Sequence, residues 1–359
     1  MNPTWVVFHI TDRCQLNCKH CLRDPELKSQ DLSLDLICNV LDEAWQLYRC
    51  KHVGLTGGEP SLHPQFYEII DAIVARGYTW HVVTNSEKFS RMVAKLDEKP
   101  ERLSTCTAMN FSIDGATEEV HDKVRGPGSF RNVMQAVAIC TMRKIPFIMQ
   151  MTVNAYNAHQ IEQMAMMASH LGSGRMSFGM TQPTGTYLDE EMFLSTAEWR
   201  TVLDTITRLQ GSLHMPVSFT DSFYREEPFF VCQPFRSEIL HVDPKGNLTL
   251  CCQHSGVPTE GAPADVLGNL HEVSLADAHQ KMLDVIHYAQ TEKNKAIKEG
   301  TLSEWDLFPC NFCMKLFKKP YWTDEGRGGV EAKRERWRGK WAVDAEKVTG
   351  CGGGPKKIA

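Results

Sequence analysis

The sequence predicts an α/β protein, namely a partial β/α barrel of six strands followed by a smaller α+β domain. In the first two hundred residues, short β-rich runs alternate with helical patterns, which is the signature of βα units built on a parallel sheet. Near Met215 this alternation stops, and a proline-rich connection leads into a segment of different character. A chain of 359 residues is long enough for two such domains.

The strands of the first domain are β-branched and aromatic runs, each followed by a segment with helical periodicity. We predict strands at Trp5–Ile10, His52–Thr56, Thr79–Thr84, Ala108–Ile113, Phe147–Val153 and Met176–Thr181. We predict helices at Leu34–Tyr48, Pro64–Arg76, Glu87–Leu96, Ser129–Met142, His159–Leu171 and Ala197–Leu209. Six units are fewer than the eight of a closed barrel, so the barrel is incomplete.

The second domain begins with a predicted hairpin, "EILHVDPKGNLTLCC", whose turn lies at Asp243–Asn247. A helix from about Ser274 to Lys298 and the segment "FPCNFC" follow. We therefore divide the chain into a core barrel (1–212), a linker (213–229), an auxiliary domain (230–322) and a charged, glycine-rich tail (323–359). We expect the tail to be poorly ordered.

Composition narrows the classes of function. A net charge of −5 gives no basic excess for nucleic acid, and no apolar stretch reaches the ~18 residues of a membrane span. The first residues lack the basic start and apolar run of a signal peptide, so we expect a cytoplasmic protein. In a reducing compartment, thirteen cysteines point to metal binding or redox chemistry rather than to disulfides.

Unusual polar and cysteine-containing segments follow the predicted strands at one end of the barrel. They are the Cys14–Cys21 loop, Gly57–Pro60, Asn85, Asp114 and Asn154. Because the carboxyl ends of barrel strands converge on one mouth, where barrel chemistry sits, we expect these segments to form one site.

The first cysteine cluster, C-x-x-x-C-x-x-C at Cys14, Cys18 and Cys21, has three thiols where zinc and iron–sulfur sites normally take four protein ligands. An iron–sulfur cubane on three thiolates leaves one iron open to a small molecule. A zinc loop would need a fourth ligand such as His20 or Asp24, and would leave the "GGEP" and "SIDG" segments unexplained.

At this point the sequence resembles the radical S-adenosylmethionine (SAM) enzymes, which carry this cysteine spacing after the first strand of a six-strand partial barrel. "GGEP" at Gly57–Pro60 is similar to the family motif that binds the methionine amino group, and "TNS" at 84–86 to the third-strand position. "SIDG" at 112–115 and "HDKVRG" at 121–126 are similar to the ribose- and carboxylate-contacting segment. The resemblance covers residues 5–182.

The resemblance implies a 4Fe–4S cluster on the three cysteines that binds SAM and, once reduced, cleaves it to a 5′-deoxyadenosyl radical that abstracts substrate hydrogen. It implies glycines that let backbone approach the ligand, Glu59 as an acceptor, Arg125 for the methionine carboxylate, and Ser112 and Asp114 for the ribose. His20 is expected to pack over the cluster or the adenine. The SAM-binding residues are predicted to be Gly57, Gly58, Glu59, Pro60, Asn85, Ser112, Asp114, Arg125 and Asn154. An electron donor such as flavodoxin or ferredoxin is the implied partner, with neither nucleic acid nor membrane.

A second cysteine group lies in the auxiliary domain. Cys232, Gly246 and Cys251 resemble the start of the SPASM/Twitch extension of radical SAM enzymes, and only the C-x-x-C of Cys310 and Cys313 follows before Cys351. The resemblance implies the shorter Twitch form, with one auxiliary 4Fe–4S cluster on Cys232, Cys251, Cys310 and Cys313. From spacing alone, zinc competes for the same four thiolates.

Cys252 and the substrate are the open points. Three roles are open for Cys252. It replaces Cys251 as a cluster ligand, it donates a hydrogen atom to a substrate radical, or it packs as a small hydrophobic residue. SPASM/Twitch enzymes mostly modify ribosomally made peptides by crosslinking, thioether formation or epimerisation, and this is the function we predict. The alternative is a dehydrogenase or epimerase of a carbohydrate or aminocyclitol, and a remote alternative is a structural zinc-binding module without catalysis.

Overall fold

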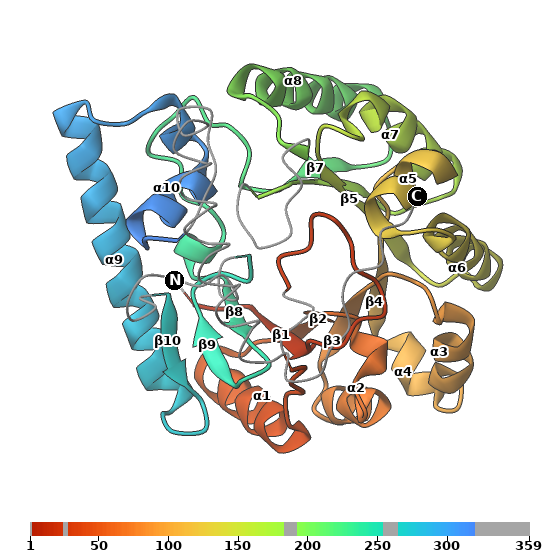
Figure 1. The fold of residues 1–359 in the computed structure, drawn as a ribbon. Helices are drawn as coiled ribbons and strands as arrows, with labels where there is room; N and C mark the ends of the chain where they lie inside the picture. Colours follow the sequence, from red (N-terminus) through yellow and green to blue (C-terminus); the bar gives the residue numbers. More distant parts are fainter. Residues whose placement is uncertain (1, 24–27, 183–191, 254–264, 320–359) are drawn as a thin grey trace, which may run out of the picture. The chain divides into compact units, whose positions relative to one another are not determined.

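The strands of the protein form one ten-stranded sheet in the order β10-β9-β8-β1-β2-β3-β4-β5-β6-β7. The computed structural model describes residues 2–23, 28–182, 192–253 and 265–319 (Figure 1). The strands are β1 Trp5–Thr11, β2 His52–Gly57, β3 Thr79–Thr84, β4 Cys106–Ser112, β5 Phe147–Val153, β6 Met176–Met180, β7 Val217–Phe219, β8 Ile239–Val242, β9 Asn247–Thr249 and β10 Val266–Asn269. The tail predicted over 323–359, with Cys351, lies outside the described residues, as does Asp24.

The helices connect and cover these strands. They are α1 Leu34–Tyr48, α2 Phe66–Ala75, α3 Phe89–Leu96, α4 Pro100–Ser104, α5 Glu118–Arg125, α6 Ser129–Arg143, α7 Ile161–His170, α8 Thr196–Ser212, α9 Leu275–Glu299 and α10 Pro309–Leu316. Short 3-10 turns lie at η1 Pro60–Leu62, η2 Ala158–Gln160, η4 Pro234–Arg236 and η5 Glu304–Leu307. No helix within the described ranges is both long and apolar enough to cross a bilayer.

Strands β1 to β7 are parallel neighbours in chain order, with helices on the outside of the curved sheet (Figure 1). The predicted partial barrel is confirmed, but it has a seventh strand, β7, inside the segment predicted as a linker. Its three residues are too short for any periodic pattern to be read from the sequence. The boundaries of the four predicted segments stay a prediction.

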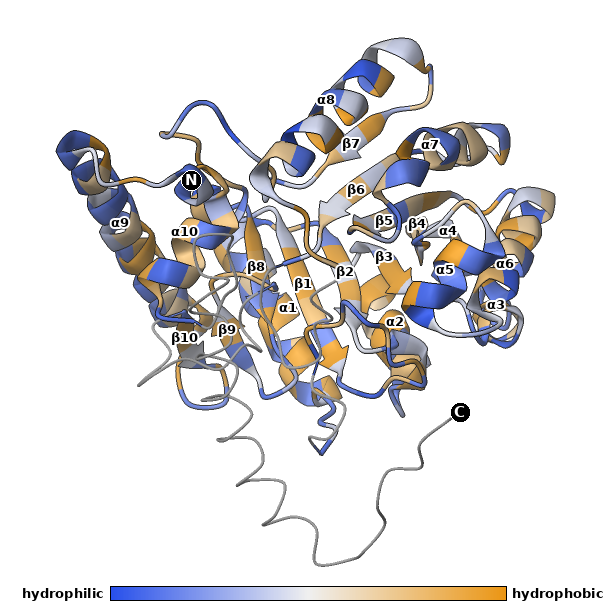
Figure 2. Ribbon diagram, turned by 45° about the horizontal axis from the view of Figure 1, so that its top comes forward, coloured by the Kyte–Doolittle hydropathy of each residue, from blue (hydrophilic) through white to orange (hydrophobic). Residues whose placement is uncertain are grey.

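The strands alternate between an apolar outer face and a partly exposed inner face. In β1, Val6, Phe8 and Ile10 are fully buried, whereas Val7 and His9 between them are half-buried. In β5, Gln150 and Thr152 occupy the same half-buried positions. Parallel sheets are usually apolar on both faces because helices cover both. Here helices cover only the outer face (Figure 2), so the inner face can carry polar groups.

The auxiliary segment joins the barrel through the sheet itself. The predicted hairpin is confirmed as β8 and β9, which pair antiparallel with Val242 opposite Leu248. Strand β8 also pairs parallel with β1, and Val7 lies opposite His241. This contact between strands more than two hundred residues apart places the auxiliary segment along the wall of the barrel.

Local chemistry explains where the helices begin and end. The side chain of Ser33 accepts a hydrogen bond from the Leu36 N–H at the start of α1, and Ser274 caps α9 in the same way. Helix α9 ends at Gly300 in the left-handed conformation that favours glycine. Helix α5, for which the sequence carries no predicted element, begins at the Thr117 cap. It carries the "HDKVR" motif residues at the mouth of the barrel.

Candidate active site

The three-cysteine loop is held at the mouth of the barrel by backbone hydrogen bonds. The Gly58 N–H donates to the Thr11 carbonyl over 2.7 Å, and the Glu59 N–H donates to the Arg13 carbonyl over 2.7 Å. At the far side of the loop, the Lys19 N–H donates to the Val124 carbonyl of α5 over 2.9 Å. The ends of β1 and β2 and helix α5 thus fix the position of the loop.

The structure gives Gly57 and Gly58 a role besides the predicted approach to a ligand. Gly57 has φ +133°, and a Cβ there would collide with the Thr11 carbonyl oxygen. A Cβ on Gly58 would collide with the Arg13 carbonyl oxygen. The close approach is therefore made by the cysteine loop's own backbone, so these glycines set the position of the loop.

Glu59 is buried and ties the end of β2 to the end of β3. Its carboxylate accepts hydrogen bonds from the Asn85 N–H at 2.8 Å, from the Thr84 hydroxyl at 3.0 and 3.1 Å, and from the Ser61 hydroxyl at 2.7 Å. Burial raises the pKa of Glu59, and these hydrogen bonds oppose the shift. Pro60 begins the 3-10 turn that follows and is buried with it. Sequence reasoning had not singled out Ser61.

Asn85, at the end of β3, faces the cysteine loop. Its Nδ2 lies 3.7 Å from the sulfur of Cys14 as a hydrogen-bond donor. Its Oδ1 accepts hydrogen bonds from Gln15 Nε2 and the Glu87 N–H, each at 3.1 Å. The amide is thereby oriented so that its NH₂ group points to sulfur, which confirms that Asn85 and the loop lie together.

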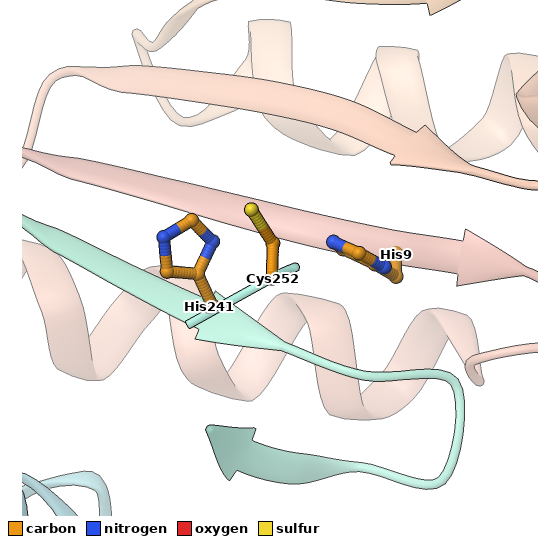
Figure 3. A group of neighbouring side chains, drawn as sticks. All are labelled: His9, His241 and Cys252. Atoms are coloured by element: carbon orange, nitrogen blue, oxygen red, sulfur yellow. The ribbon is translucent and has the colours of Figure 1, made fainter. Parts of the chain in front are cut away.

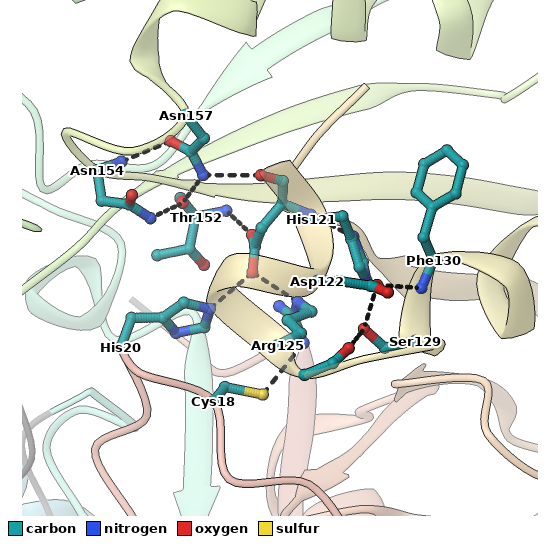
Figure 4. A network of polar contacts seen from close by, with 12 residues as sticks. Cys18, His20, His121, Asp122, Arg125, Ser129, Phe130, Thr152, Asn154 and Asn157 are labelled. Atoms are coloured by element: carbon teal, nitrogen blue, oxygen red, sulfur yellow. Dashed lines mark hydrogen bonds and ion pairs between the residues drawn. The ribbon is translucent and has the colours of Figure 1, made fainter. Parts of the chain in front are cut away.

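Asp114 is the centre of a fully buried polar network at the end of β4 (Figure 4). Its Oδ2 lies 2.7 Å from His20 Nε2 and 2.5 Å from Arg125 Nε, and its Oδ1 accepts from the Thr152 N–H at 2.8 Å. Burial alone would raise the pKa of Asp114, but Arg125 and His20 beside it hold it well below its usual range. Its carboxylate is therefore an anion whose contacts are all within the protein.

Arg125 connects this network to the cysteines. It is buried at the end of α5, and its Nη1 lies 4.0 Å from the sulfur of Cys18. The ring of His20 is hydrogen-bonded to Asp114, and its packing over the cluster or the adenine stays a prediction. This hydrogen bond has a local reason, because the loop docked on α5 brings His20 over the end of β4.

Asn154 and Asn157 close the far side of the mouth, after β5. Asn154 is fully buried; its N–H donates to Asn157 Oδ1 at 2.8 Å, and its own amide bonds Thr152 O and the Tyr156 N–H. Asn157 Nδ2 donates to the Asp114 carbonyl at 3.0 Å. Asn157, which the sequence analysis missed, thus fixes the end of β4. Ser112, the last residue of β4, is half-buried.

The three loop thiols suit an iron–sulfur cluster with one open iron. Burial raises the pKa of Cys14 and raises that of Cys18 to about 11. Metal binding needs the thiolate, and the donors from Asn85 and Arg125 offset part of the cost of charge on sulfur. The chemistry of this donor set therefore fits the group that the spacing predicted.

The second thiol group is assembled from distant segments. Cys310 and Cys313 lie three residues apart at the start of α10, Cys232 precedes η4, and Cys251 follows β9. Burial raises the pKa of Cys232 to about 12 and, with mutual repulsion among these thiolates, raises the pKa values of Cys310 and Cys313. Because these thiolates raise one another's pKa values, the four cysteines lie near one another in the fold.

The fold and the first site together define a partial β/α barrel with three thiols on one loop at its mouth. Residues 8–168 match the Radical SAM superfamily. This segment of the chain belongs to the Radical SAM superfamily.

Three curated relatives resemble parts of the chain. The mycofactocin maturase MftC of Mycobacterium ulcerans is 29% identical over 55% of this chain and 53% of its own length. The AdoMet-dependent heme synthase of Methanosarcina barkeri is 27% identical over 58% and 59%. The PqqA peptide cyclase of Ruegeria pomeroyi is 24% identical over 71% and 69%. The chain thus spans little more than half the length of the first two.

Among solved structures, SuiB of Streptococcus suis bound to S-adenosylmethionine superposes with a TM-score of 0.61 at 12% identity, covering 77% of this chain and 65% of SuiB. At this identity the likeness confirms the fold. The superfamily carries a 4Fe–4S cluster and SAM, which agrees with the cofactors predicted for the first site.

Proposed function

We propose that this chain cleaves SAM reductively, with the first 4Fe–4S cluster held by Cys14, Cys18 and Cys21. The observation that carries the proposal is the cysteine loop itself. It is fixed at the carboxyl ends of the strands, and two of its thiols face N–H donors, from Asn85 and Arg125. When bound, the cluster and SAM supply a 5′-deoxyadenosyl radical that abstracts hydrogen from a substrate.

The surrounding residues orient the cofactor rather than react with it. Arg125 offers the guanidinium N–H groups not used by Asp114 to the SAM carboxylate. Asp114 keeps Arg125 and His20 in place, and its predicted contact with the ribose would use the acceptor capacity that these two residues and the Thr152 N–H leave on its carboxylate. Ser112 takes no part in the Asp114 network, so its hydroxyl is the first candidate for a hydrogen bond to the ribose. Gly57 to Pro60 present backbone to the amino group, while Glu59 holds that turn against β3.

A second 4Fe–4S cluster on Cys232, Cys251, Cys310 and Cys313 is the proposed occupant of the auxiliary site. Four thiolates on one zinc ion, each at about 2.3 Å, lie no more than about 4.6 Å apart. All four cysteines are described, and no three of them have sulfurs that all lie within 4.8 Å of one another. The wider separation favours a cluster. With four protein ligands, it is suited to electron transfer or structural support.

A peptide is the proposed substrate. Support comes from the relative named as a PqqA peptide cyclase, which matches over most of this chain, and from the resemblance of the auxiliary cysteines to SPASM/Twitch enzymes. The modification would be a crosslink, a thioether or an epimerised residue. A flavodoxin or ferredoxin would supply the electron.

The polar inner face supports a second candidate. Ser112, Gln150, Thr152 and Ser177 point from neighbouring strands to the half-buried inner side. Hydroxyl and amide groups at such positions suit a carbohydrate or aminocyclitol, and one relative is a heme synthase. A dehydrogenase or epimerase of a small polar molecule is therefore the alternative.

The test of the first proposal is anaerobic reconstitution of the wild type and of a Cys14/Cys18/Cys21→Ala variant. We expect about eight iron per chain in the wild type, about four in the variant, and 5′-deoxyadenosine from the wild type only. Cys38→Ala, at a half-buried position on α1, is the matched control and should behave as wild type. A variant that keeps all its iron and still forms 5′-deoxyadenosine would refute the assignment.

The substrate class is tested separately. A short precursor reading frame beside the gene would supply a peptide to incubate with the reduced enzyme and SAM. A mass change in that peptide supports peptide maturation. Turnover of a sugar or aminocyclitol, with no peptide modified, would establish the alternative instead.

A further inference from the structure

His9, His241 and Cys252 form a compact group on the inner face of the barrel, beside the proposed cluster ligand Cys251 but made of residues that neither proposed cluster uses. One ligand atom of each residue lies within 4.8 Å of the others. Figure 3 shows the thiol of Cys252 between the two imidazoles. In the described part of the chain, no other three His, Cys, Asp or Glu side chains come this close. The sequence analysis singled out Cys252 but neither histidine.

The sheet register explains how the group forms. Strand β8 pairs parallel with β1, and His241 of β8 lies opposite Val7 of β1. Val7 is the inward-facing residue that precedes His9 on β1. Residues two apart on a strand share a face, so both imidazoles project to the inner side of neighbouring strands. The chain leaving β9 then places Cys252 over them.

Two of the three groups have unused polar atoms in the interior. His241 is only 5% exposed, and its Nδ1 has no hydrogen-bond partner; His9 Nε2 is likewise buried without one. Buried polar nitrogens are normally paired, and a bound ion is one of the standard reasons for an exception. Burial also lowers the pKa of His9 and lowers that of His241 to about 3, so both rings are neutral, which is the form that binds metal.

We propose that His9, His241 and Cys252 bind one divalent transition-metal ion of zinc's ligand preference, with a fourth coordination position open. Two imidazoles and one thiolate at this spacing match a zinc donor set, and three protein ligands are typical of zinc sites that accept water or a substrate group. The open position would take an anionic or carbonyl oxygen. The site lies on the half-buried inner face, where a substrate would be held.

The ion would also link two parts of the chain. His9 belongs to the first barrel strand, whereas His241 and Cys252 belong to the segment that carries the auxiliary cysteines. A thiolate bound to an ion carries no S–H, so this role excludes the hydrogen-donor role predicted for Cys252. It also excludes Cys252 as a ligand of the auxiliary cluster, although its side chain is hydrogen-bonded to that of Cys251.

The test uses the full chain with its clusters reconstituted and then supplied with ZnCl₂. After desalting, we expect about one zinc per chain beyond the iron, and X-ray absorption at the zinc edge should show one sulfur and two nitrogen ligands from protein. Absence of bound zinc, or zinc with four sulfur ligands, would overturn the proposal. Because this measurement uses the wild type, it does not depend on whether a variant folds.

Variants then locate the site. His9→Ala and His241→Ala should each weaken zinc binding by at least about tenfold while iron content and 5′-deoxyadenosine formation stay at wild-type levels. His81→Ala is the matched control. His81 is a half-buried imidazole at an inward position of β3 and is hydrogen-bonded to His52, so its loss should leave zinc in place. Cys252→Ser should lose zinc and keep about eight iron; a loss of about four iron would make Cys252 a cluster ligand and refute the proposal.

The open position has its own readout. With Co²⁺ in place of zinc, a thiolate-bound ion gives visible absorption, and added azide should shift those bands if a coordination position is free. Bands that azide leaves unchanged would show a closed site. Neither readout depends on SAM cleavage, so failure of the proposed reaction and failure of this site are distinguishable.

Discussion

The two thiol sites differ in how they are built. The barrel-mouth site takes its three cysteines from one eight-residue loop that backbone hydrogen bonds already fix to β1, β2 and α5. The auxiliary site takes four cysteines from three segments, and burial together with mutual repulsion raises the pKa values of Cys310 and Cys313. The first site is therefore built within one loop that its neighbours order, whereas the second forms only where three distant segments of the chain meet. A site that must present an open iron gains from being ordered in advance, since no fourth ligand restrains it.

The largest expected effect separates the two sites by function. Cys18→Ser and Cys310→Ser should each lose about four iron, but only Cys18→Ser should abolish 5′-deoxyadenosine formation, by at least about a thousandfold. The reason is that only the first site has a position for SAM. Anaerobic assays with iron counting provide the measurement. If Cys310→Ser also abolished SAM cleavage, the roles of the two sites would not be separable in this way.

The next effect tests whether the barrel-mouth site is ordered by its buried charges. Asp114→Asn leaves Arg125 buried without a counter-charge, and breaking such a pair costs about 3–5 kcal/mol. Denaturant unfolding of the wild type and the variant measures this loss in the free energy of unfolding. The matched control is Asp97→Asn, which breaks the exposed Arg143–Asp97 pair and should cost no more than about 1 kcal/mol. Equal losses in the two variants would mean that the Asp114 network does not support the fold.

The sequence revealed the barrel, the hairpin and the positions around its mouth because these depend on local periodicity and on spacing within motifs. It did not reveal that Gly57 and Gly58 also approach the carbonyls of Thr11 and Arg13, because these atoms become neighbours only in the folded chain. It could not reveal the His9–His241 contact either. That contact depends on β8 pairing with β1, and no local pattern encodes a pairing across more than two hundred residues.

A pH effect should follow from His121, which lies within the barrel-mouth network and accepts a hydrogen bond from the Asp114 N–H at 3.0 Å. Burial, together with nearby Arg125, lowers its pKa to about 4. The unfolded chain binds a proton near pH 6.5 and the folded chain only near 4, so stability is full above 6.5 and declines between these values. Between these two pH values, the titration of His121 changes the free energy of unfolding by about 1.4 kcal/mol per pH unit.

Unfolding experiments across pH 4 to 7 would measure this slope in the wild type and in His121→Asn. Asparagine keeps an acceptor for the Asp114 N–H but does not titrate, so the slope should fall by one proton's contribution. His214→Ala, at an exposed position, is the control and should leave the slope as it is. An unchanged slope in His121→Asn would show that His121 is not the source of acid sensitivity.

The smallest effect concerns Lys293 of α9, the cation beside the auxiliary thiols. Burial lowers its pKa, and the charges of Cys313 and Cys232 oppose that shift, which places the ammonium close to those two sulfurs. A positive charge near a cluster stabilises its reduced, more negative form. Lys293→Met should therefore lower the reduction potential of the auxiliary cluster, on the order of tens of millivolts, while the first cluster keeps its potential. Redox titration followed by electron paramagnetic resonance measures both clusters in one sample. Lys295→Met, at an exposed position on the same helix, is the control and should leave both reduction potentials unchanged. If Lys293→Met also changed the potential of the first cluster, the two sites would be coupled more closely than their separate construction implies.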